Sequence, residues 1–296
     1  MSRFKMNMKN ECVLCVLNQI LRVSNFLNRS EEMTNKIFFQ ALKQASRTDF
    51  LSLTAPEFAE HIYDIFSRMS GDDDPYKKLR KDQNEMILNR IDYFRDEIKG
   101  SRDRLFTAGF YSLIGNMIDY GGVQLYDEVE LFKKYQSVKL ALNDFSEFKK
   151  KLKRGKKILI IADNAGEAVF DLLLLEQMRV VNPEADFFYA VRSKPAINDV
   201  IKEDAEFIGI GQFASILESG STFAGTIIKK SSPRFKDVFF TSDLIISKGQ
   251  GNFETLEGES ENILFVFKVK CDVVARYTGL KMGDLVFAFK DSIFKK

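Results

Sequence analysis

Three short polar segments in the C-terminal half of the chain carry side chains that could do chemistry. They are residues 163–167 (Asp-Asn-Ala-Gly-Glu), 193–199 (Ser-Lys-Pro-Ala-Ile-Asn-Asp) and 248–252 (Lys-Gly-Gln-Gly-Asn), and each follows an apolar run. Carboxylate and amide oxygens are hard ligands that suit magnesium or manganese. A lysine can neutralise a phosphate as a compact charge. Together these residue types are those of a metal-assisted phosphoryl site.

The first segment joins an apolar run at 158–161 to a helical pattern at 169–181. Asp163 and Asn164 are therefore candidate metal ligands, and Gly166 would let the backbone approach a ligand closely. The start of the following helix would favour an anion such as phosphate. Glu167 is a candidate acid, base or supporting carboxylate, or it simply favours the helix N-terminus. The alternative for the whole segment is a plain helix cap, because Asp and Asn cap helices routinely.

The other two segments would add a carboxylate and a cation. Asp199 follows the apolar run 187–191 and is the third candidate metal ligand, with a helix cap again as the alternative. Lys248 closes the apolar run that begins at 244, and Gly249 and Gly251 free the backbone to fold over a bound group. The alternative there is a tight strand-to-helix turn with a surface lysine.

The elements that must position these residues change in character near residue 150. From residue 11 to about 150, apolar residues recur at spacings of three and four, which predicts about six to eight amphipathic helices. After Gly155, short apolar runs alternate with helical patterns. We predict a helical domain at 1–150 and an α/β Rossmann-like domain at 151–296 that carries the metal site.

The apolar runs of the second half predict a buried, mainly parallel sheet covered by helices on both faces. The fold class is thus α/β, with a helical N-terminal domain packed on a three-layer α/β/α domain whose sheet is doubly wound. In such sheets ligands bind beyond the carboxyl ends of the strands, which is where the three polar segments fall. The predicted strands are 158–161, 187–191, 214–217, 244–246, 263–269 and 285–289.

Composition excludes several classes of protein. The net charge is only +2, from 44 basic and 42 acidic side chains, whereas a nucleic-acid-binding protein would usually carry a strong basic excess. The first ten residues are polar and no run of about 18 apolar residues occurs, so we expect neither a signal peptide nor a membrane span. Three cysteines are too few for a secreted disulfide scaffold, and we expect a cytoplasmic protein.

Motifs that are absent from the sequence argue against several further classes of enzyme. No Gly-x-Gly-x-x-Gly follows the first strand, which argues against a dinucleotide fold, and no P-loop sequence occurs. The single histidine, His61, makes a Ser-His-Asp hydrolase or a multi-histidine zinc enzyme improbable.

Several motifs closely resemble the damage-control phosphatase family, also known as domain of unknown function 89. They are residues 163–167 with Phe170-Asp171, residues 247–254 (Ser-Lys-Gly-Gln-Gly-Asn-Phe-Glu), residues 74–76 (Asp-Pro-Tyr) and residues 115–121 (Gly-Asn-Met-Ile-Asp-Tyr-Gly). The resemblance covers nearly the whole chain, and the Cys12-x-x-Cys15 and Lys270-Cys271 pairs resemble its prokaryotic and archaeal branch. One departure is Arg80, where the family pattern has lysine, which weakens any role assigned to the loop at Asp74.

The resemblance implies a helical region packed on an α/β/α sandwich and divalent-metal-dependent hydrolysis of small phosphomonoesters. By motif match the metal ligands fall on Asp163, Asn164 and Asp199, and Lys248 falls at the phosphate. The implied cofactor is Mg, Mn, Co or Ni. We therefore predict Asp163, Lys248 and Glu167 as catalytic residues, and Asn116, Asp119, Lys248, Gly251 and Asn252 as substrate-binding residues.

Asn116 and Asp119 are three residues apart, so on a helix they would share a face. A capped helix end before the two following glycines is the alternative. Cys12 and Cys15 would also share a helical face, and with Cys271 and His61 they could form a structural zinc site. The simpler interpretation is that the thiols and His61 are structural, buried side chains.

The favoured function is a metal-dependent phosphatase acting on a small phosphorylated metabolite, without a nucleic-acid or membrane partner and with homo-oligomerisation left open. The alternatives are a carboxyl methyltransferase, since the α/β half could hold a nucleotide-like cofactor, and a non-catalytic metabolite-binding protein. Against the methyltransferase, only Gly166 stands where a glycine-rich first turn would be needed. A phospho-aspartyl intermediate on Asp163 and direct attack by water both remain open.

Overall fold

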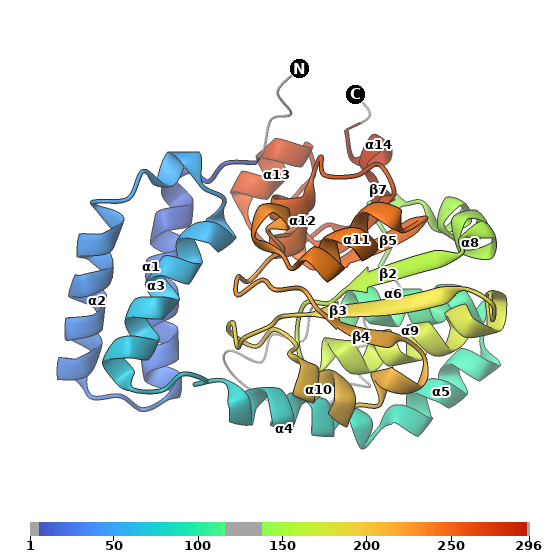
Figure 1. Cartoon of the computed structure of the whole chain (residues 1–296), viewed down its shortest axis with the longest axis horizontal. Helices are drawn as coiled ribbons and strands as arrows, with labels where there is room; N and C mark the ends of the chain where they lie inside the picture. Colours follow the sequence, from blue (N-terminus) through green and yellow to red (C-terminus); the bar gives the residue numbers. More distant parts are fainter. Residues whose placement is uncertain (1–5, 116–137, 295–296) are drawn as a thin grey trace.

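The computed structural model describes residues 6–115 and 138–294, and every structural statement below concerns that part of the chain. Figure 1 shows three helices beside a sheet that carries helices on both faces. The α-helices are α1 (Asn10–Phe26), α2 (Glu31–Ala45), α3 (Ala55–Ser70), α4 (Lys77–Leu88), α5 (Ile91–Gly100), α6 (Arg104–Gly115), α8 (Phe145–Arg154), α9 (Glu167–Val181), α10 (Lys202–Phe207), α11 (Pro233–Thr241), α12 (Gln250–Leu256), α13 (Asp272–Thr278) and α14 (Lys290–Ile293). Short 3₁₀ turns are η1 (Phe50–Ser52), η2 (Ile210–Gln212) and η3 (Ile228–Lys230).

The sheet has the strand order β1-β7-β6-β5-β2-β3-β4, and only the β6–β7 pair is antiparallel among the strands described. The strands are β1 (Leu142–Asn143), β2 (Lys157–Ile161), β3 (Asp186–Val191), β4 (Ser215–Glu218), β5 (Leu244–Lys248), β6 (Ile263–Lys268) and β7 (Leu285–Phe289). The predicted mainly parallel, doubly wound sheet and all six predicted strands are confirmed. The pattern does not predict β1, because a two-residue edge strand carries no periodicity.

Period-two alternation distributes the strand residues between two cores. In β2, Ile158 and Ile160 pack with α9 on one face of the sheet, whereas Leu159 and Ile161 pack with α11 and α12 on the other. Figure 1 shows these helix layers above and below the strands. Each fully buried leucine or isoleucine here stabilises the fold by about 1.5–3 kcal/mol. Burial on both faces of the sheet explains why the strands appear in the sequence as continuous apolar runs.

Helices α1, α2 and α3 form a third core of their own, built from residues such as Ile20, Ile37 and Phe58. The start of α3 is fixed by a capping box: Glu57 Oε2 accepts the Thr54 N–H at 2.8 Å, and Thr54 Oγ1 accepts the Glu57 N–H. The cap matters for the site, because it places Pro56 against the loops that surround the carboxyl edge of the sheet.

Helices α4, α5 and α6 share the core of the sheet rather than that of α1–α3, since Ile87, Phe94 and Leu113 pack in the same cluster as α9. In the structure, packing therefore changes between α3 and α4. The domain boundary at residue 150 stays a prediction. In the described ranges, no helix is both long enough and apolar enough to cross a membrane.

Candidate active site

The strand order reverses at β2, which lies between β3 and β5. From β2 the chain continues to β3 and β4 on one side, and later enters β5, β6 and β7 on the other. Ile161 pairs with Ala190 of β3 and with Ser247 of β5, so the carboxyl ends of these strands lie level. This switch point is where doubly wound sheets bind ligands. All three polar segments singled out in the sequence emerge from it.

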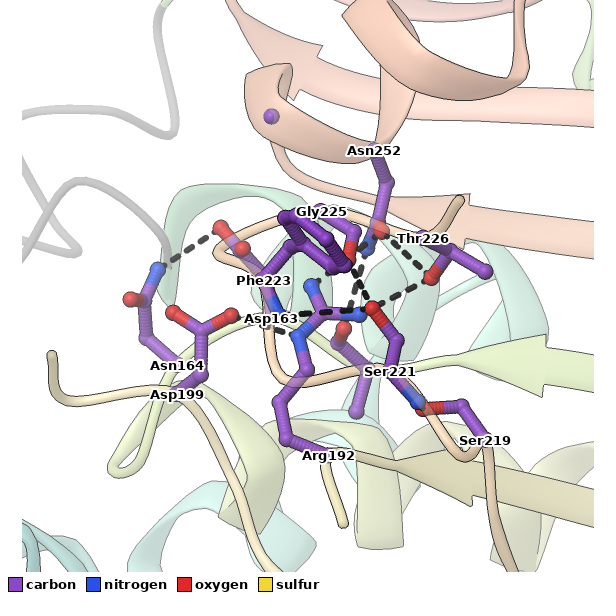
Figure 2. A network of polar contacts seen from close by, with 12 residues as sticks. Asp163, Asn164, Arg192, Asp199, Ser219, Ser221, Phe223, Gly225, Thr226 and Asn252 are labelled. Atoms are coloured by element: carbon purple, nitrogen blue, oxygen red, sulfur yellow. Dashed lines mark hydrogen bonds and ion pairs between the residues drawn. The ribbon is translucent and has the colours of Figure 1, made fainter. Parts of the chain in front are cut away.

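Asp163, Asn164 and Asp199, the predicted metal ligands, are brought together at this edge (Figure 2). Asn164 Nδ2 donates to Asp163 Oδ2 at 2.7 Å, and the backbones of Asn164 and Asp199 form an isolated antiparallel bridge. The Val200 N–H donates to the Asp163 carbonyl at 2.9 Å. These backbone contacts connect the loop after β3 to the loop after β2. Oxygen donors from both loops therefore lie close together.

The carboxylate of Asp199 is buried, with 3% of the residue exposed, and its Oδ2 accepts a hydrogen bond from Arg192 Nε at 2.7 Å. Burial raises the pKa of Asp199 to about 7, although Arg192 opposes this shift, and the nearby Asp163 carboxylate adds to it. Two carboxylates held close together in a buried place repel each other. A divalent cation between them would relieve that repulsion, so the residues fit a hard metal ion.

The candidate centre has only two charged ligands and one amide. Among residues 6–115 and 138–294 there is no group of three or more His, Cys, Asp or Glu side chains placed to hold a metal. Asn164 Oδ1 would have to serve as the third oxygen. Gly249 makes room for this arrangement, because a Cβ at that position, where φ is +80°, would lie 2.0 Å from Asp163 Oδ2.

The loop that delivers Asp199 is strained. Ile197, two residues earlier, has φ +52°, a left-handed conformation that costs a β-branched residue about 1–3 kcal/mol. The same residue lines a cavity of about 480 Å³ between α3 and the loops at the carboxyl edge. The cavity is also lined by Glu60, Tyr63, Asp64, Asp74, Tyr76, Lys194, Thr222 and Ala224. A larger cavity of about 760 Å³ is lined by residues such as Phe106 and Leu140. Among the described residues, neither cavity is lined by Asp163, Asn164 or Asp199.

Lys248, predicted to lie at the phosphate, is held by buried protein groups in the structure. The side chain is completely buried, and its Nζ donates to Glu167 Oε1 at 2.6 Å, to Asp171 Oδ1 at 2.6 Å and to the Ser112 carbonyl at 3.0 Å. Burial alone would lower the pKa of Lys248, but Asp171 and Glu167 raise it, so the ammonium stays charged. All three ammonium protons are used by protein groups in this structure, and the predicted phosphate contact stays a prediction. Lys248 is buried because β5 is a central strand whose end is covered by α9.

Glu167 and Asp171 are the partners that hold Lys248. Glu167 also reaches toward the metal ligands, since its Oε2 lies 3.4 Å from Asn164 Nδ2. Burial raises the pKa of Glu167 to about 7 even though Lys248 opposes it. Asp171 accepts further hydrogen bonds from the Ser112 and Tyr189 hydroxyls, at 2.6 Å and 2.9 Å. Sequence reasoning gave Asp171 no role of its own, although the Phe170-Asp171 pair is part of the family resemblance.

The N-terminus of α9 is occupied by protein groups rather than open to an anion. The Ala165 N–H donates to the Asn198 carbonyl at 2.9 Å, and the Gly166 N–H donates to Asn84 Oδ1 at 2.7 Å. These two amides are therefore not available for the predicted phosphate contact at this helix start. Asn84, contributed by α4, was not singled out from the sequence, because a polar residue in an amphipathic helix gives no signal of its tertiary partner.

Two residues predicted to bind substrate also connect parts of the framework, and their contact with substrate stays a prediction. Asn252 is buried, its Nδ2 donates to the carbonyls of Ala162 and Lys248, and its Oδ1 accepts from Arg192 and Thr226. Gly251 packs beneath the neighbouring loop, where an added Cβ would lie 2.4 Å from the Ala224 carbonyl. Asn116 and Asp119, the other predicted substrate contacts, lie outside the described residues.

The three cysteines are all free thiols. Cys15 is exposed, whereas Cys12 and Cys271 are half-buried, and Cys271 Sγ accepts a hydrogen bond from Gln250 Nε2 at 3.5 Å. Burial raises the pKa of Cys12 and of Cys15, which favours the neutral thiol. Among the described residues, no group of three or more His, Cys, Asp or Glu side chains is placed to hold a metal. Because Cys15 is exposed, the expectation of buried thiols is wrong for that residue.

We expect the double variant Cys12→Ala/Cys15→Ser to lose about 1–2 kcal/mol of unfolding free energy, mostly from Cys12, because only that side chain packs against the core. Turnover should survive. Urea denaturation and the steady-state rate of the same preparation would measure both. A folded double variant without turnover would instead give the thiols a functional role.

Doubly wound sheets bind ligands at the switch point, which is where Asp163, Asn164 and Asp199 lie in this structure. Residues 8–286 match the family described as Damage-control phosphatase ARMT1-like domain. The chain belongs to this family, as its sequence motifs predict.

Curated relatives match over almost their whole length. A damage-control phosphatase of Pyrococcus horikoshii is 30% identical over 284 residues, covering 95% of this chain and 97% of the relative. A damage-control phosphatase of Archaeoglobus fulgidus is 28% identical over 282 residues, covering 93% and 96%. An uncharacterized protein of Methanocaldococcus jannaschii is 28% identical, with 94% of each chain covered. The crystal structure of a DUF89 family protein from Pyrococcus horikoshii superposes with a TM-score of 0.89 at 28% identity, over 97% of this chain and all of the other.

Proposed function

We propose that this protein is a metal-dependent phosphatase that hydrolyses small phosphomonoesters, such as sugar phosphates or damaged phosphorylated metabolites. The observation that carries the proposal is the convergence of Asp163, Asn164 and Asp199 at the switch point of the sheet. Family membership supports the reaction class, since the relatives are named damage-control phosphatases. The chemistry of the oxygen donors supports Mg, Mn, Co or Ni as the cofactor.

The bound ion would supply positive charge that stabilises phosphate oxygens and makes a water more acidic. Residues of this chain would hold the ion and take the proton. Asp163 and Asp199 would hold the ion, with the Asn164 amide oxygen as a neutral ligand. Glu167, held by Lys248 and adjacent to Asn164, would orient that amide and is the carboxyl group available to take a proton. The neighbouring cavity of about 480 Å³ has the size that a small metabolite requires.

The function is tested by phosphate release from a panel of phosphomonoesters. We expect turnover by protein supplied with Mg, Mn, Co or Ni, and loss of turnover after chelator treatment and dialysis that returns when metal is added back. The same preparations would be tested for methyl transfer to carboxyl groups. Undiminished hydrolysis by metal-free protein would contradict the metal requirement, and transfer without hydrolysis would favour the methyltransferase alternative. Binding of phosphorylated metabolites without turnover would favour a sensor.

A further inference from the structure

Arg192 is a buried side chain that joins the candidate metal site to the loop beside the cavity. It follows the end of β3, only 2% of the residue is exposed, and its three guanidinium nitrogens each donate to a different segment. Nε donates to Asp199 Oδ2 at 2.7 Å, one terminal nitrogen to Thr226 Oγ1 at 2.8 Å, and the other to Asn252 Oδ1 at 3.1 Å. Figure 2 shows this fan of contacts, with the second Asp199 oxygen on the side facing Asn164.

The partners of Arg192 are themselves fixed. The Thr226 hydroxyl donates to Asn252 Oδ1 at 2.9 Å, and Asn252 Nδ2 donates to the carbonyls of Ala162 and Lys248 at 3.0 Å and 2.7 Å. Ala162 directly precedes Asp163 in the chain. The Arg192 guanidinium therefore donates directly to the carboxylate of Asp199. Through Asn252 it is also connected to the backbone next to Asp163.

The position of the loop 219–226 depends on the hydrogen bond between Arg192 and Thr226. Gly225 packs against α12 and α3, where an added Cβ would lie 2.9 Å from the Gly251 carbonyl and 3.1 Å from Pro56 Cβ. This close approach is what allows Thr226 to reach Arg192. Farther along the loop, Thr222 hydrogen-bonds Glu60 of α3, and Thr222 and Ala224 line the cavity beside Asp199.

We infer that Arg192 is a positioning residue: it holds Asp199 in its metal-binding orientation and couples that carboxylate to the loop 219–226 that borders the substrate cavity. The inference rests on the proposed function. Arg192 occupies one oxygen of Asp199 and leaves the other for the ion. Only a planar guanidinium can make these three contacts at once. A lysine ammonium in the same place could pair with Asp199 but could not also reach Thr226 and Asn252 in their fixed positions. Groups that orient metal ligands typically contribute 10- to 100-fold in metal affinity or activity.

The test is Mn²⁺ binding, followed by the electron paramagnetic resonance signal of free Mn²⁺ during titration of chelator-stripped protein. We expect Arg192→Lys to weaken binding by about tenfold. Arg179→Lys is the matched control, since Arg179 also donates three hydrogen bonds, to carbonyls of Phe213, Pro183 and Ala185 near the opposite ends of the strands. The control should bind Mn²⁺ like the wild type. Thermal unfolding in chelator would be recorded for every variant.

A double-mutant cycle separates positioning from mere support of the fold. If Arg192 acts through Asp199, then Arg192→Lys should weaken Mn²⁺ binding much less in an Asp199→Asn background than in the wild type. A purely structural role would give the same loss in both backgrounds, which would overturn the inference. Should Arg192→Lys fail to fold, Thr226→Val removes at nearly constant shape the hydroxyl that accepts from Arg192 and donates to Asn252, and it is expected to weaken Mn²⁺ binding by about threefold.

Failure of the inference is distinguishable from failure of the proposed function. If the wild type binds Mn²⁺ and Asp199→Asn weakens that binding, while Arg192→Lys and Thr226→Val both bind like the wild type, only the role of Arg192 is wrong. If the wild type does not bind Mn²⁺, or Asp199→Asn binds it equally well, the metal centre itself is wrong and the inference falls with it.

Discussion

The Asp199→Asn protein is expected to lose about a hundred- to a thousandfold in phosphomonoesterase turnover, the loss typical of removing an electrostatic group from the reacting centre. Asp199 is one of only two carboxylates in the candidate ligand set, and both come from strand ends that meet at the switch point. The asparagine retains an oxygen that can accept from Arg192 Nε, so the buried arginine keeps a partner. The loss should therefore appear in kcat and in Mn²⁺ affinity, measured by phosphate release and by direct titration.

Asparagine is a more informative substitution than alanine at this position, because it separates lost activity from lost stability. Asp199→Ala would leave the Arg192 charge buried beside an empty space, and breaking a buried ion pair costs about 3–5 kcal/mol. Lost activity would then be confounded with lost stability. A suitable control is Asp186→Asn, at the exposed opposite end of β3, which should leave both turnover and metal binding intact. Near wild-type turnover by Asp199→Asn would remove Asp199 from the ligand set.

The sheet could be predicted from sequence because its strands are buried on both faces. In β2 the last four residues are apolar, in β5 the first three are, and each strand is followed by a turn that contains glycine. Chain order and the right-handed connection rule then place these strand ends together. The convergence of Asp163, Asn164 and Asp199 follows from that topology alone, which is why the candidate ligands could be named without a structure.

The roles of Lys248 and Arg192 could not be predicted, because they depend on tertiary partners far away in sequence. Lys248 meets Ser112 of α6 and two carboxylates of α9, and Arg192 meets Thr226 and Asn252. A basic residue at a strand end has the same local signal whether it faces a ligand or is buried in an ion pair. What distinguishes the two cases is whether buried carboxylates lie within reach, and a single sequence does not encode that distance in any local pattern.

Lys248→Ala is expected to destabilise the protein strongly, by about 3–5 kcal/mol of unfolding free energy. Removing the ammonium leaves Glu167 and Asp171 buried, with about 1% of each side chain exposed and no cation between them. Denaturant titration would measure the loss. Lys36→Ala, which breaks an exposed lysine–glutamate pair on α2, should by contrast cost less than about 1 kcal/mol.

The deficit of Lys248→Ala should also depend on pH in a definite direction. Burial already raises the pKa of Glu167 to about 7 when Lys248 opposes the shift, so without Lys248 this pKa rises further. A carboxyl group whose folded-state pKa is raised contributes its full stability at low pH and loses it as pH rises above the unfolded value. The variant should therefore be closer to the wild type at pH about 5 than at pH about 8. A deficit that is constant across that range would mean that the two carboxylates are not what destabilises the variant.

A combined variant separates stability from catalysis at this site. In Lys248→Met/Glu167→Gln/Asp171→Asn the charges are removed together, and neutral replacement of a whole buried ionic cluster often costs little stability. We expect this protein to recover most of the stability lost in Lys248→Ala, yet to remain inactive, because Glu167 no longer supplies a carboxylate beside Asn164. Recovery of both stability and turnover would show that the cluster of Lys248, Glu167 and Asp171 only supports the fold, and the chemistry would then rest on Asp163, Asn164 and Asp199 alone.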